Sequence, residues 1–291
     1  MSEDHRARPK LSIVIPTFQR PPALARCLRA LEEQTLPASH LEIIVVDDAG
    51  TSSSRAVGGQ SKLLAHVHLI RHPKNAGAGA ARNTGARAAK APYVAFIDDD
   101  CIAEPEWADA LLARFAKEPE AALAGEVTIG EPQLATDRVT QLLSEPATSE
   151  DGSLLRAQSA NLAVPAPAFH NLGGFDERFQ GAGYEDYELC SRWRRAGHQI
   201  VAVPEAIVHH MRDTTLFGFW RQHYRYGKGA YMLYGRNRGE PSPSLASTWQ
   251  RIAQAVAGGR NLSERLRHTG LVGLSQTAML AGFATARISR F

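Results

Sequence analysis

The first hundred residues alternate between short apolar runs and helical stretches. Four runs are rich in β-branched residues and have the length of strands; they cover residues 11–16, 41–46, 67–70 and 93–97. Pro22 opens a helical stretch after the first run, and a Gly/Ala-rich helix follows the third. Because a parallel crossover needs a helix to return the chain, this order predicts a doubly wound, mostly parallel sheet of the α/β class.

Two of the predicted strands end in aspartates. Asp47 and Asp48 follow the second run, and Asp98, Asp99 and Asp100 follow the fourth. Sheets of this kind bind ligands in the crevice beyond the carboxyl ends of their strands. We therefore expect both acidic clusters to lie at one crevice, although about fifty residues separate them.

The remainder of the chain fits one large domain with an extension. Its 291 residues, 44% of them apolar, can bury one large core. We predict a disordered polar lead over 1–10, an α/β domain over 11–213 and a helical C-terminal extension over 214–291. Within the domain, helices are predicted over 104–117 and 184–195, strands over 121–129 and 157–164, and a polar loop over 132–151.

Charge and cysteine content exclude several classes of protein. The net charge of +3, from 33 basic and 30 acidic residues, is too balanced for a protein that coats nucleic acid. The three cysteines are widely separated and match no disulfide or zinc pattern, which favours a reducing cytoplasm. Residues 1–10 lack the apolar core of a secretory signal, and polar residues interrupt the apolar stretch 271–284. We expect a cytoplasmic protein without a membrane-spanning helix.

The two aspartate clusters each have two interpretations. Three consecutive carboxylates repel one another unless a cation or several donors lie among them, and their oxygen atoms suit Mg²⁺ or Mn²⁺. The alternative is a solvated turn with an aspartate that caps the helix starting near Glu104. The pair Asp47-Asp48 either accepts hydrogen bonds from a base or ribose, or forms an ordinary Asx-turn.

A glycine-rich segment over residues 75–79 precedes a helix that carries Arg82 and Asn83. Small residues let backbone N–H groups approach an anion at a helix N-terminus, so the segment, with Asn75 and Gly77, resembles a phosphate-binding loop. It is not a dinucleotide fingerprint, because the third glycine is missing and no such motif follows the first strand.

A second glycine-rich region, residues 173–183, leads into an acidic helix. Glu188 and Arg192 have the i,i+4 spacing of an ion pair, so Glu188 is predicted to be structural. Asp186 lies in the first turn of this helix, where it either interacts favourably with the helix dipole or acts as a general base.

His209 and His210 follow an apolar run, so one of them points inward. Such a pair is usually structural. Beside an aspartate metal site, however, the inward histidine can serve as an additional ligand, and we favour His209.

The order of these motifs resembles the inverting family 2 glycosyltransferases of the GT-A fold. The resemblance extends from residue 11 to about residue 229. It rests on IPTFQR at 15–20, VDD at 46–48, residues 75–83, DDD at 98–100, GGFDE at 173–177, ED at 185–186 and the histidine pair. It implies a GT-A catalytic domain over 11–213, with a Rossmann-like nucleotide-binding half over 11–103 and an acceptor half over 104–213. One departure is Ala49-Gly50-Thr51, where the family more often has Gly-Ser-Thr.

The resemblance also implies roles for individual residues. The expected nucleotide-sugar-binding residues are Pro16, Thr17, Arg20, Asp47, Asn75, Gly77, Arg82, Asp98, Asp99 and Glu185. Among them, Thr17 and Asp47 would contact the nucleoside, whereas Asp98 and Asp99 would lie by the ribose and diphosphate. Asp100, together with His209, is expected to bind Mn²⁺ or Mg²⁺. Asp186 matches the family's catalytic base.

The implied reaction moves a sugar from a nucleoside-diphosphate-sugar to an acceptor hydroxyl with inversion of configuration. UDP-sugars are the first expectation and dTDP-sugars the second, with a saccharide, a lipid-linked molecule or another alcohol as acceptor. Two alternatives stay open. A sugar-1-phosphate nucleotidyltransferase would need an early glycine/arginine-rich phosphate loop that the chain lacks, and a non-catalytic carbohydrate-binding module would not need Asp100 and Asp186. The oligomeric state is left open.

Residues 216–238 mix aromatic with basic side chains, a composition suited to a membrane interface. Peripheral attachment would place the protein at the inner face of the membrane. The alternatives are a helix that packs its aromatic residues on the catalytic domain, and a lid in which Arg221 or Arg225 reaches the diphosphate.

Overall fold

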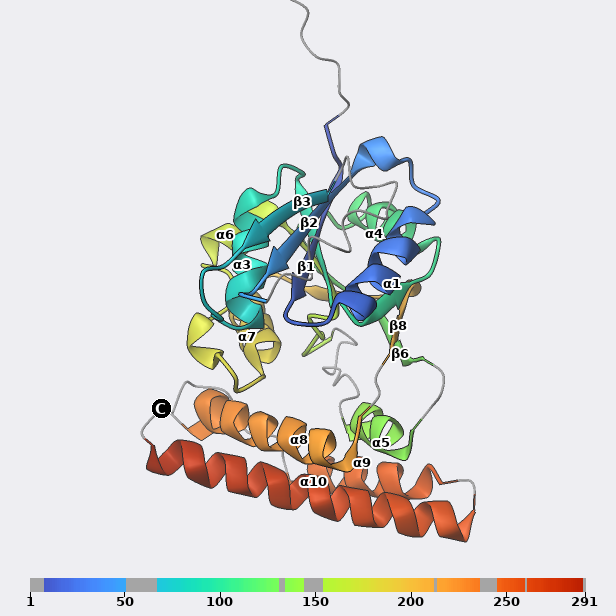
Figure 1. The fold of residues 1–291 in the computed structure, drawn as a ribbon, viewed down its shortest axis with the longest axis vertical. Coiled ribbons are helices and arrows are strands. Elements are labelled where there is room, and N and C mark those ends of the chain that lie inside the picture. The colour runs from blue at the N-terminus through green and yellow to red at the C-terminus, as the bar shows by residue number, and fades with distance from the viewer. Residues whose placement is uncertain are drawn as a thin grey trace, which may run out of the picture.

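A mixed sheet of eight strands forms the centre of the molecule, with the spatial order β3-β2-β1-β4-β7-β6-β8-β5 (Figure 1). The structure is a computed structural model that describes residues 8–50, 67–130, 134–143, 154–211, 214–235, 245–259 and 261–289. The strands are β1 Leu11–Thr17, β2 Leu41–Asp47, β3 Val67–Arg71, β4 Tyr93–Ile97, β5 Cys101–Ala103, β6 Ala122–Ile129, β7 Asn161–Pro165 and β8 Ile200–His210. Strands β3, β2, β1 and β4 are parallel, as are β6 and β8, whereas β7 and β5 are antiparallel to their neighbours.

Helices cover both faces of this sheet (Figure 1). They are α1 Pro21–Glu32, α3 Ala78–Ala88, α4 Trp107–Phe115, α5 Ala135–Leu143, α6 Ala166–Asn171, α7 Glu185–Arg195, α8 Leu216–Ala230, α9 Leu245–Ala257 and α10 Leu262–Ile288, with short turns η1 Ala38–His40, η3 Glu177–Phe179 and the π-helical η4 Tyr231–Gly235. Ile13 and Ile15 of β1 belong to the core under α1 and α4. Val14 belongs to the core under α3, α6 and α7. Strand β1 is thus buried on both faces, as its continuous apolar run requires.

Most of the predicted elements are confirmed, with shifted ends. The four β-branched runs are strands, and α7 is followed by Gly197 in the left-handed conformation of a helix C-terminus. The polar loop predicted over 132–151 is partly wrong, because nine of its residues form the helix α5, Ala135–Leu143. Val139 of α5 is fully buried against Phe219 and Leu271, so packing on the C-terminal helices stabilises this helix. The rest of that loop and residues 1–7 of the predicted lead lie outside the described residues.

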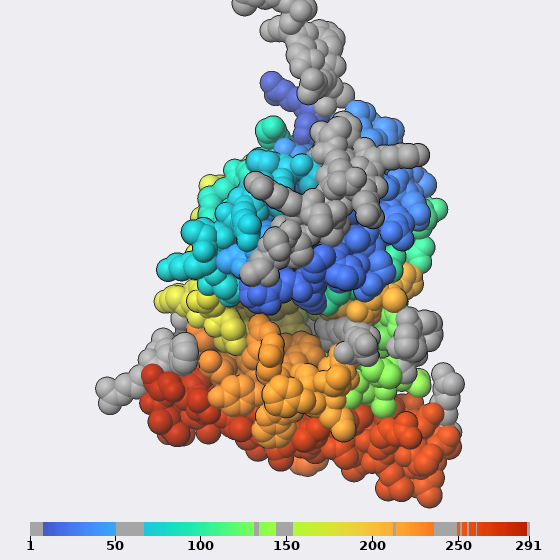
Figure 2. All heavy atoms as spheres, viewed as in Figure 1, coloured from blue at the N-terminus to red at the C-terminus, as the bar shows by residue number. Residues whose placement is uncertain are grey.

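The C-terminal extension is helical, as predicted, and forms a separate layer beside the α/β domain (Figures 1 and 2). Helices α8 and α10 approach so closely that side chains at two glycines would meet backbone. A Cβ on Gly227 would lie 2.0 Å from the Met279 oxygen, and one on Gly282 would lie 1.9 Å from the Tyr224 oxygen. Among the helices of the described residues, none is both long and apolar enough to cross a membrane.

A pair of glycines on α10 gives a matched test of this contact. Gly282→Ala should lower the free energy of unfolding by about 1–3 kcal/mol, because the new methyl group forces α8 and α10 apart. Gly273→Ala should raise it by about 0.5–1 kcal/mol, since a Cβ there meets no described atom within 4 Å and alanine favours the helix. Chemical denaturation of both variants measures the difference. Equal effects would contradict the close approach.

Candidate active site

The two acidic clusters lie at the same edge of the sheet, as predicted from the strand ends. Thr17 at the end of β1 is in register with Asp47 at the end of β2, and the neighbouring strand β4 ends at Ile97, just before the triplet. The hydroxyl of Thr17 donates to Asp99 Oδ2 at 2.7 Å. This hydrogen bond ties the ends of β1 and β4 together.

Each carboxylate of the triplet is paired with a cation of the protein itself. Arg20, just before α1, reaches Asp99 Oδ1 at 2.9 Å and Asp100 Oδ2 at 2.5 Å. Arg82 of α3 is almost completely buried and reaches Asp98 Oδ1 at 2.5 Å. Asp99 is fully buried, and burial raises the pKa of its carboxyl to about 7, against the opposing effects of Arg20 and Thr17. The arginines therefore provide compensating charge for the three adjacent carboxylates.

The histidine that faces the triplet is His210, so the preference for His209 is wrong. Nε2 of His210 lies 3.0 Å from Asp100 Oδ1. His209 points the other way: its Nδ1 pairs with the Thr128 hydroxyl at 2.7 Å, and its Nε2 contacts Glu104. Strand alternation explains this outcome, because His210 shares a face of β8 with the buried Ala206 and Val208.

One group of possible metal ligands forms here among the described residues. Ligand atoms of Asp100, Cys101 and His210 all lie within 4.8 Å of one another. The carboxylate oxygen and imidazole nitrogen are donors that Mn²⁺ and Mg²⁺ accept, whereas a thiol suits softer ions.

Two amides of the glycine-rich segment before α3 are occupied by an internal carboxylate. The backbone N–H groups of Ala76 and Gly77 donate to the Asp48 carboxylate at 2.9 and 2.8 Å, and the Asn75 amide donates to the Asp48 carbonyl at 3.3 Å. His72 Nδ1 lies 2.8 Å from the same carboxylate. The Asp48 carboxylate therefore occupies two of the amides of this segment, and contact between a phosphate and the N-terminus of α3 stays a prediction.

The Asp47 side chain closes a local turn, although its hydrogen bond reaches three residues on, whereas an Asx-turn reaches two. Its Oδ1 accepts from the Gly50 N–H at 2.7 Å, and Arg71 Nε lies 3.6 Å from Oδ2. The Asp47 side chain is buried. Its contact with a nucleoside stays a prediction. Thr51 and its successors up to residue 66 lie outside the described residues.

A cavity of about 570 Å³ opens at this edge, between the sheet and α8. Six of the predicted site residues line it, namely Arg20, Arg82, Asp98, Asp100, Glu185 and Asp186. The other predicted residues do not line it: Pro16, Thr17, Asp47, Asn75, Gly77, Asp99 and His209. Thr17 and Asp99 instead support the floor through their mutual hydrogen bond.

Asp186 enters the cavity from the first turn of α7. Gly183 and Tyr184 just before it both have left-handed backbone angles, with φ of +77° and +72°, which turn the chain sharply into the helix. Asp186 Oδ2 accepts from the Ser159 N–H at 3.2 Å, and Oδ1 accepts from the Tyr187 N–H at 2.9 Å. Burial, reinforced by the neighbouring Glu185, raises the pKa of Asp186 to about 7. A carboxyl with such a pKa is suited to proton transfer near neutral pH.

The raised pKa of Asp186 makes the stability of the ligand-free protein depend on pH. The carboxyl titrates near pH ~3.9 in an unfolded chain but near pH 7 in the fold. Between these values the folded state binds more protons, so stability falls as pH rises. The Asp186→Asn variant has no carboxyl at this position and should not lose stability in this way as pH rises. Its melting temperature should exceed that of the wild type by more at pH 8 than at pH 5, and a difference that does not grow with pH would contradict the assignment.

Several cavity residues were not predicted from the sequence. They are Arg26 of α1, Gln158 and Ser159 before β7, and Gln222 and Tyr226 of α8. Arg225 was considered as part of a lid, and its Nε donates to the Gly181 carbonyl at 3.2 Å. The sequence gives little sign of the others, because they come from a loop and two helices that only the tertiary fold brings to the sheet edge.

The predicted ion pair of α7 is confirmed. Arg192 Nη2 lies 2.6 Å from Glu188 Oε2, and the same guanidinium donates to the carbonyls of Leu172 and Gly174. The pair thus fastens the second glycine-rich region to α7 and takes no part in the cavity.

Comparisons with known proteins agree with this architecture. The family model described as glycosyl transferase family 2 matches residues 12–175, and a second model, the N-terminal domain of galactosyltransferase, matches residues 156–214. Validoxylamine A glucosyltransferase of Streptomyces hygroscopicus subsp. jinggangensis is 31% identical over 220 residues, which cover 65% of this chain and 52% of that protein. Pre-mycofactocin glycosyltransferase of Mycobacterium tuberculosis is 29% identical over 247 residues, which cover 81% and 50%. The chain thus spans about half the length of these relatives.

Solved structures show the same fold at low sequence identity. The mannosyltransferase PcManGT from Pyrobaculum calidifontis, in complex with GDP-Man and Mn²⁺, superposes with a TM-score of 0.66 at 17% identity, covering 98% of this chain and 88% of that one. Residues 1–349 of TarS from S. aureus, in complex with UDP-GlcNAc, give a TM-score of 0.60 at 14% identity, with coverages of 95% and 83%. Since the family model matches more than half of the residues, this chain belongs to glycosyl transferase family 2 and has the GT-A fold.

Proposed function

We propose that the protein transfers a sugar from a nucleoside-diphosphate-sugar to an acceptor hydroxyl, with inversion and with the help of a divalent cation. The observation that supports this most is that Asp100, His210 and Asp186 line one cavity at the carboxyl edge of the sheet. A metal-ligand pair and a candidate base therefore border the same space. The similar proteins PcManGT and TarS were solved with GDP-Man and Mn²⁺ and with UDP-GlcNAc.

The residues present fit a divalent cation. Asp100 and His210 offer an oxygen and a nitrogen close together, and Arg20, which pairs with Asp100, has a half-exposed side chain that can move aside. A bound Mn²⁺ or Mg²⁺ would neutralise the charge that develops on the leaving diphosphate. Arg20 and Arg82 add positive charge beside the same space, which favours an anionic donor.

The protein's own residues then carry out the proton transfer. The acceptor oxygen forms a bond to the anomeric carbon, and the bond from that carbon to the diphosphate oxygen breaks with its electron pair. The Asp186 carboxylate takes the proton of the acceptor hydroxyl. A single displacement of this kind inverts the configuration at the anomeric carbon. UDP-sugars are the proposed donors, followed by dTDP-sugars.

A nucleotide panel tests this proposal. Thermal shift and calorimetry with UDP, dTDP and GDP, each with and without Mn²⁺, should show binding of at least one diphosphate that strengthens with the cation; a ligand at 100 times its Kd adds about 2.7 kcal/mol of stability. A nucleotidyltransferase would instead need a triphosphate. Absence of any diphosphate binding, or of donor hydrolysis with every sugar nucleotide, would refute the proposed transfer.

The histidine pair offers a matched test of the metal site. His210→Ala should weaken Mn²⁺ binding by about 10-fold or more, because it removes a nitrogen beside Asp100. His209→Ala, one residue away and facing Glu104, should leave the Mn²⁺ affinity unchanged. Calorimetric titration of Mn²⁺ in the presence of UDP measures both. A larger effect from His209→Ala would reject the assignment.

A further inference from the structure

A second cavity, of about 240 Å³, adjoins the first at Asp186. It lies between the start of α7 and the C-terminal helices α8, α9 and α10. Gln158, Tyr184, Asp186 and Tyr226 line both cavities. Asp186 therefore borders both spaces, whereas Asp98 and Asp100 line only the first.

Aromatic rings form much of the wall of this second cavity. Tyr184 packs against Tyr187, Tyr226 and Tyr234 with ring centroids 4.9, 5.9 and 6.4 Å apart, all edge to face. Such walls offer flat apolar surfaces to a ring-shaped ligand, while a few polar groups fix its orientation. One polar group is the hydroxyl of Ser275 on α10, which is fully buried and has no hydrogen-bond partner among the described residues.

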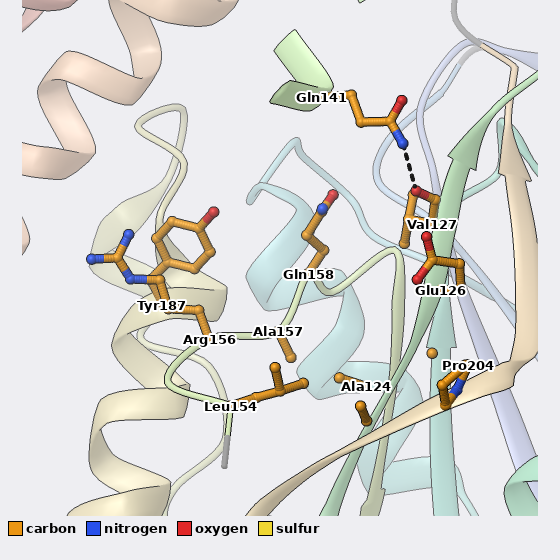
Figure 3. A pocket seen from close by; sticks show the side chains of 12 residues that line it. Ala124, Glu126, Val127, Gln141, Leu154, Arg156, Ala157, Gln158, Tyr187 and Pro204 are labelled. Carbon is orange, nitrogen blue, oxygen red and sulfur yellow. Dashed lines mark hydrogen bonds between the residues drawn. The ribbon is translucent and has the colours of Figure 1, made fainter. Parts of the chain in front are cut away.

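The second polar group is the guanidinium of Arg156. It lies over the Tyr187 ring at 5.0 Å from the centroid and donates to the Tyr234 hydroxyl at 3.1 Å. Within the described part of the chain, no carboxylate lies within ion-pair distance of it. Arg156 also borders a smaller cavity of about 170 Å³, where Figure 3 shows it beside Tyr187, with Gln158 pointing into the space. A half-buried arginine without an anionic partner is a favourable site for a carboxylate or a phosphate.

We propose that this second cavity binds the acceptor, and that the acceptor is a ring-shaped alcohol carrying an anionic group, a carboxylate or a phosphate, that pairs with Arg156. The inference rests on the proposed sugar transfer. The anionic group lies at Arg156, the ring lies among the tyrosines, and the reacting hydroxyl points to Asp186. The C-terminal helices thus form part of the acceptor site.

Binding of paired neutral and anionic probes tests the inference. Calorimetry would compare 4-nitrophenyl β-D-glucuronide with 4-nitrophenyl β-D-glucoside, and glucose 6-phosphate with glucose, in the presence of UDP and Mn²⁺ to occupy the first cavity. For the wild type we expect at least one anionic probe to bind about 10-fold or more tightly than its neutral counterpart. The two pairs distinguish a carboxylate-binding site from a phosphate-binding one.

Variants locate this preference at Arg156. The ratio of the two dissociation constants should fall to within about twofold of one in Arg156→Gln and be partly kept in Arg156→Lys, which retains the positive charge. Arg29→Gln, which removes an exposed arginine from α1, should keep the wild-type ratio. Because each ratio is measured within one variant, a general loss of stability does not change it.

The outcomes separate this inference from the proposed function. A wild type without anionic preference, or an Arg156→Gln variant that keeps it, overturns the inference and leaves the proposed transfer intact. Failure of every nucleoside diphosphate to bind in the panel refutes the proposed transfer instead.

Discussion

Replacing Asp100 by alanine should abolish transfer and remove the dependence of nucleotide affinity on Mn²⁺. Asp100 is the carboxylate of the one group of possible metal ligands found among the described residues. Without Asp100 the divalent cation would bind weakly, and the charge on the leaving diphosphate would lose its main compensation. We expect a fall in turnover of about 10³-fold or more. Calorimetry of UDP with and without Mn²⁺ measures the binding side of this prediction.

The fold should survive this substitution. The Asp100 carbonyl, which accepts from the Met211 N–H at 2.8 Å, is kept in alanine, and the removed carboxylate is one of three adjacent like charges. Glu104→Ala is the matched control, because Glu104 is an acid near the other end of β5 that faces His209. We expect its metal dependence to equal that of the wild type. Unchanged Mn²⁺-dependent affinity in Asp100→Ala would remove Asp100 from the site.

The sheet edge could be predicted because it depends on local rules. Each β-branched run predicts a strand. Because the carboxyl ends of parallel strands lie at the same edge of a sheet, Asp47 and Asp98 had to lie at one edge. Thr17 ends β1, the strand between β2 and β4, and the register of β1 with β2 places it beside Asp47. The glycines and acids at 183–186 likewise predicted the start of α7 and so the position of Asp186, whose role as the base is a proposal.

The histidine and the glycine-rich loop could not be settled in the same way. Ala206, Ile207 and Val208 are all apolar, so the sequence does not show which alternate residues of β8 face inward, and only the structure places His210 beside Asp100. The amides of Ala76 and Gly77 look free in the sequence. Only the fold shows that Asp48, on another strand end, occupies them.

The cavities depend even more on tertiary structure. Arg156 precedes a strand by several residues, Tyr234 belongs to a π-helical turn, and Ser275 lies inside a long helix. No local pattern brings these three positions together. They meet because α8 and α10 pack through glycines against each other and close the space beside α7. Packing partly explains the aromatic residues of α8: Tyr226 lines the cavities, and Phe219 is buried against Val139 of α5 and Leu271 of α10.

Asp186→Asn should lower transfer by about 10²-fold or more while donor binding stays close to that of the wild type. Asparagine has the shape of aspartate but cannot take a proton from the acceptor hydroxyl. It can still accept one of the two N–H groups, from Ser159 or Tyr187, that the carboxylate holds now. Product formation at saturating donor, together with the Kd of UDP, measures the two effects separately.

The pH dependence and the neighbouring acid make the role of Asp186 specific. Because a base acts in its ionised form, the wild-type kcat/KM should rise with pH through about 7, the raised pKa of Asp186, and level off above it. The residual rate of Asp186→Asn should lack this rise. Glu185, which pairs with Arg82 at 3.2 Å, is the other carboxylate on this turn. If Glu185→Gln removes the rise and Asp186→Asn keeps it, Glu185 is the base and Asp186 only positions the turn.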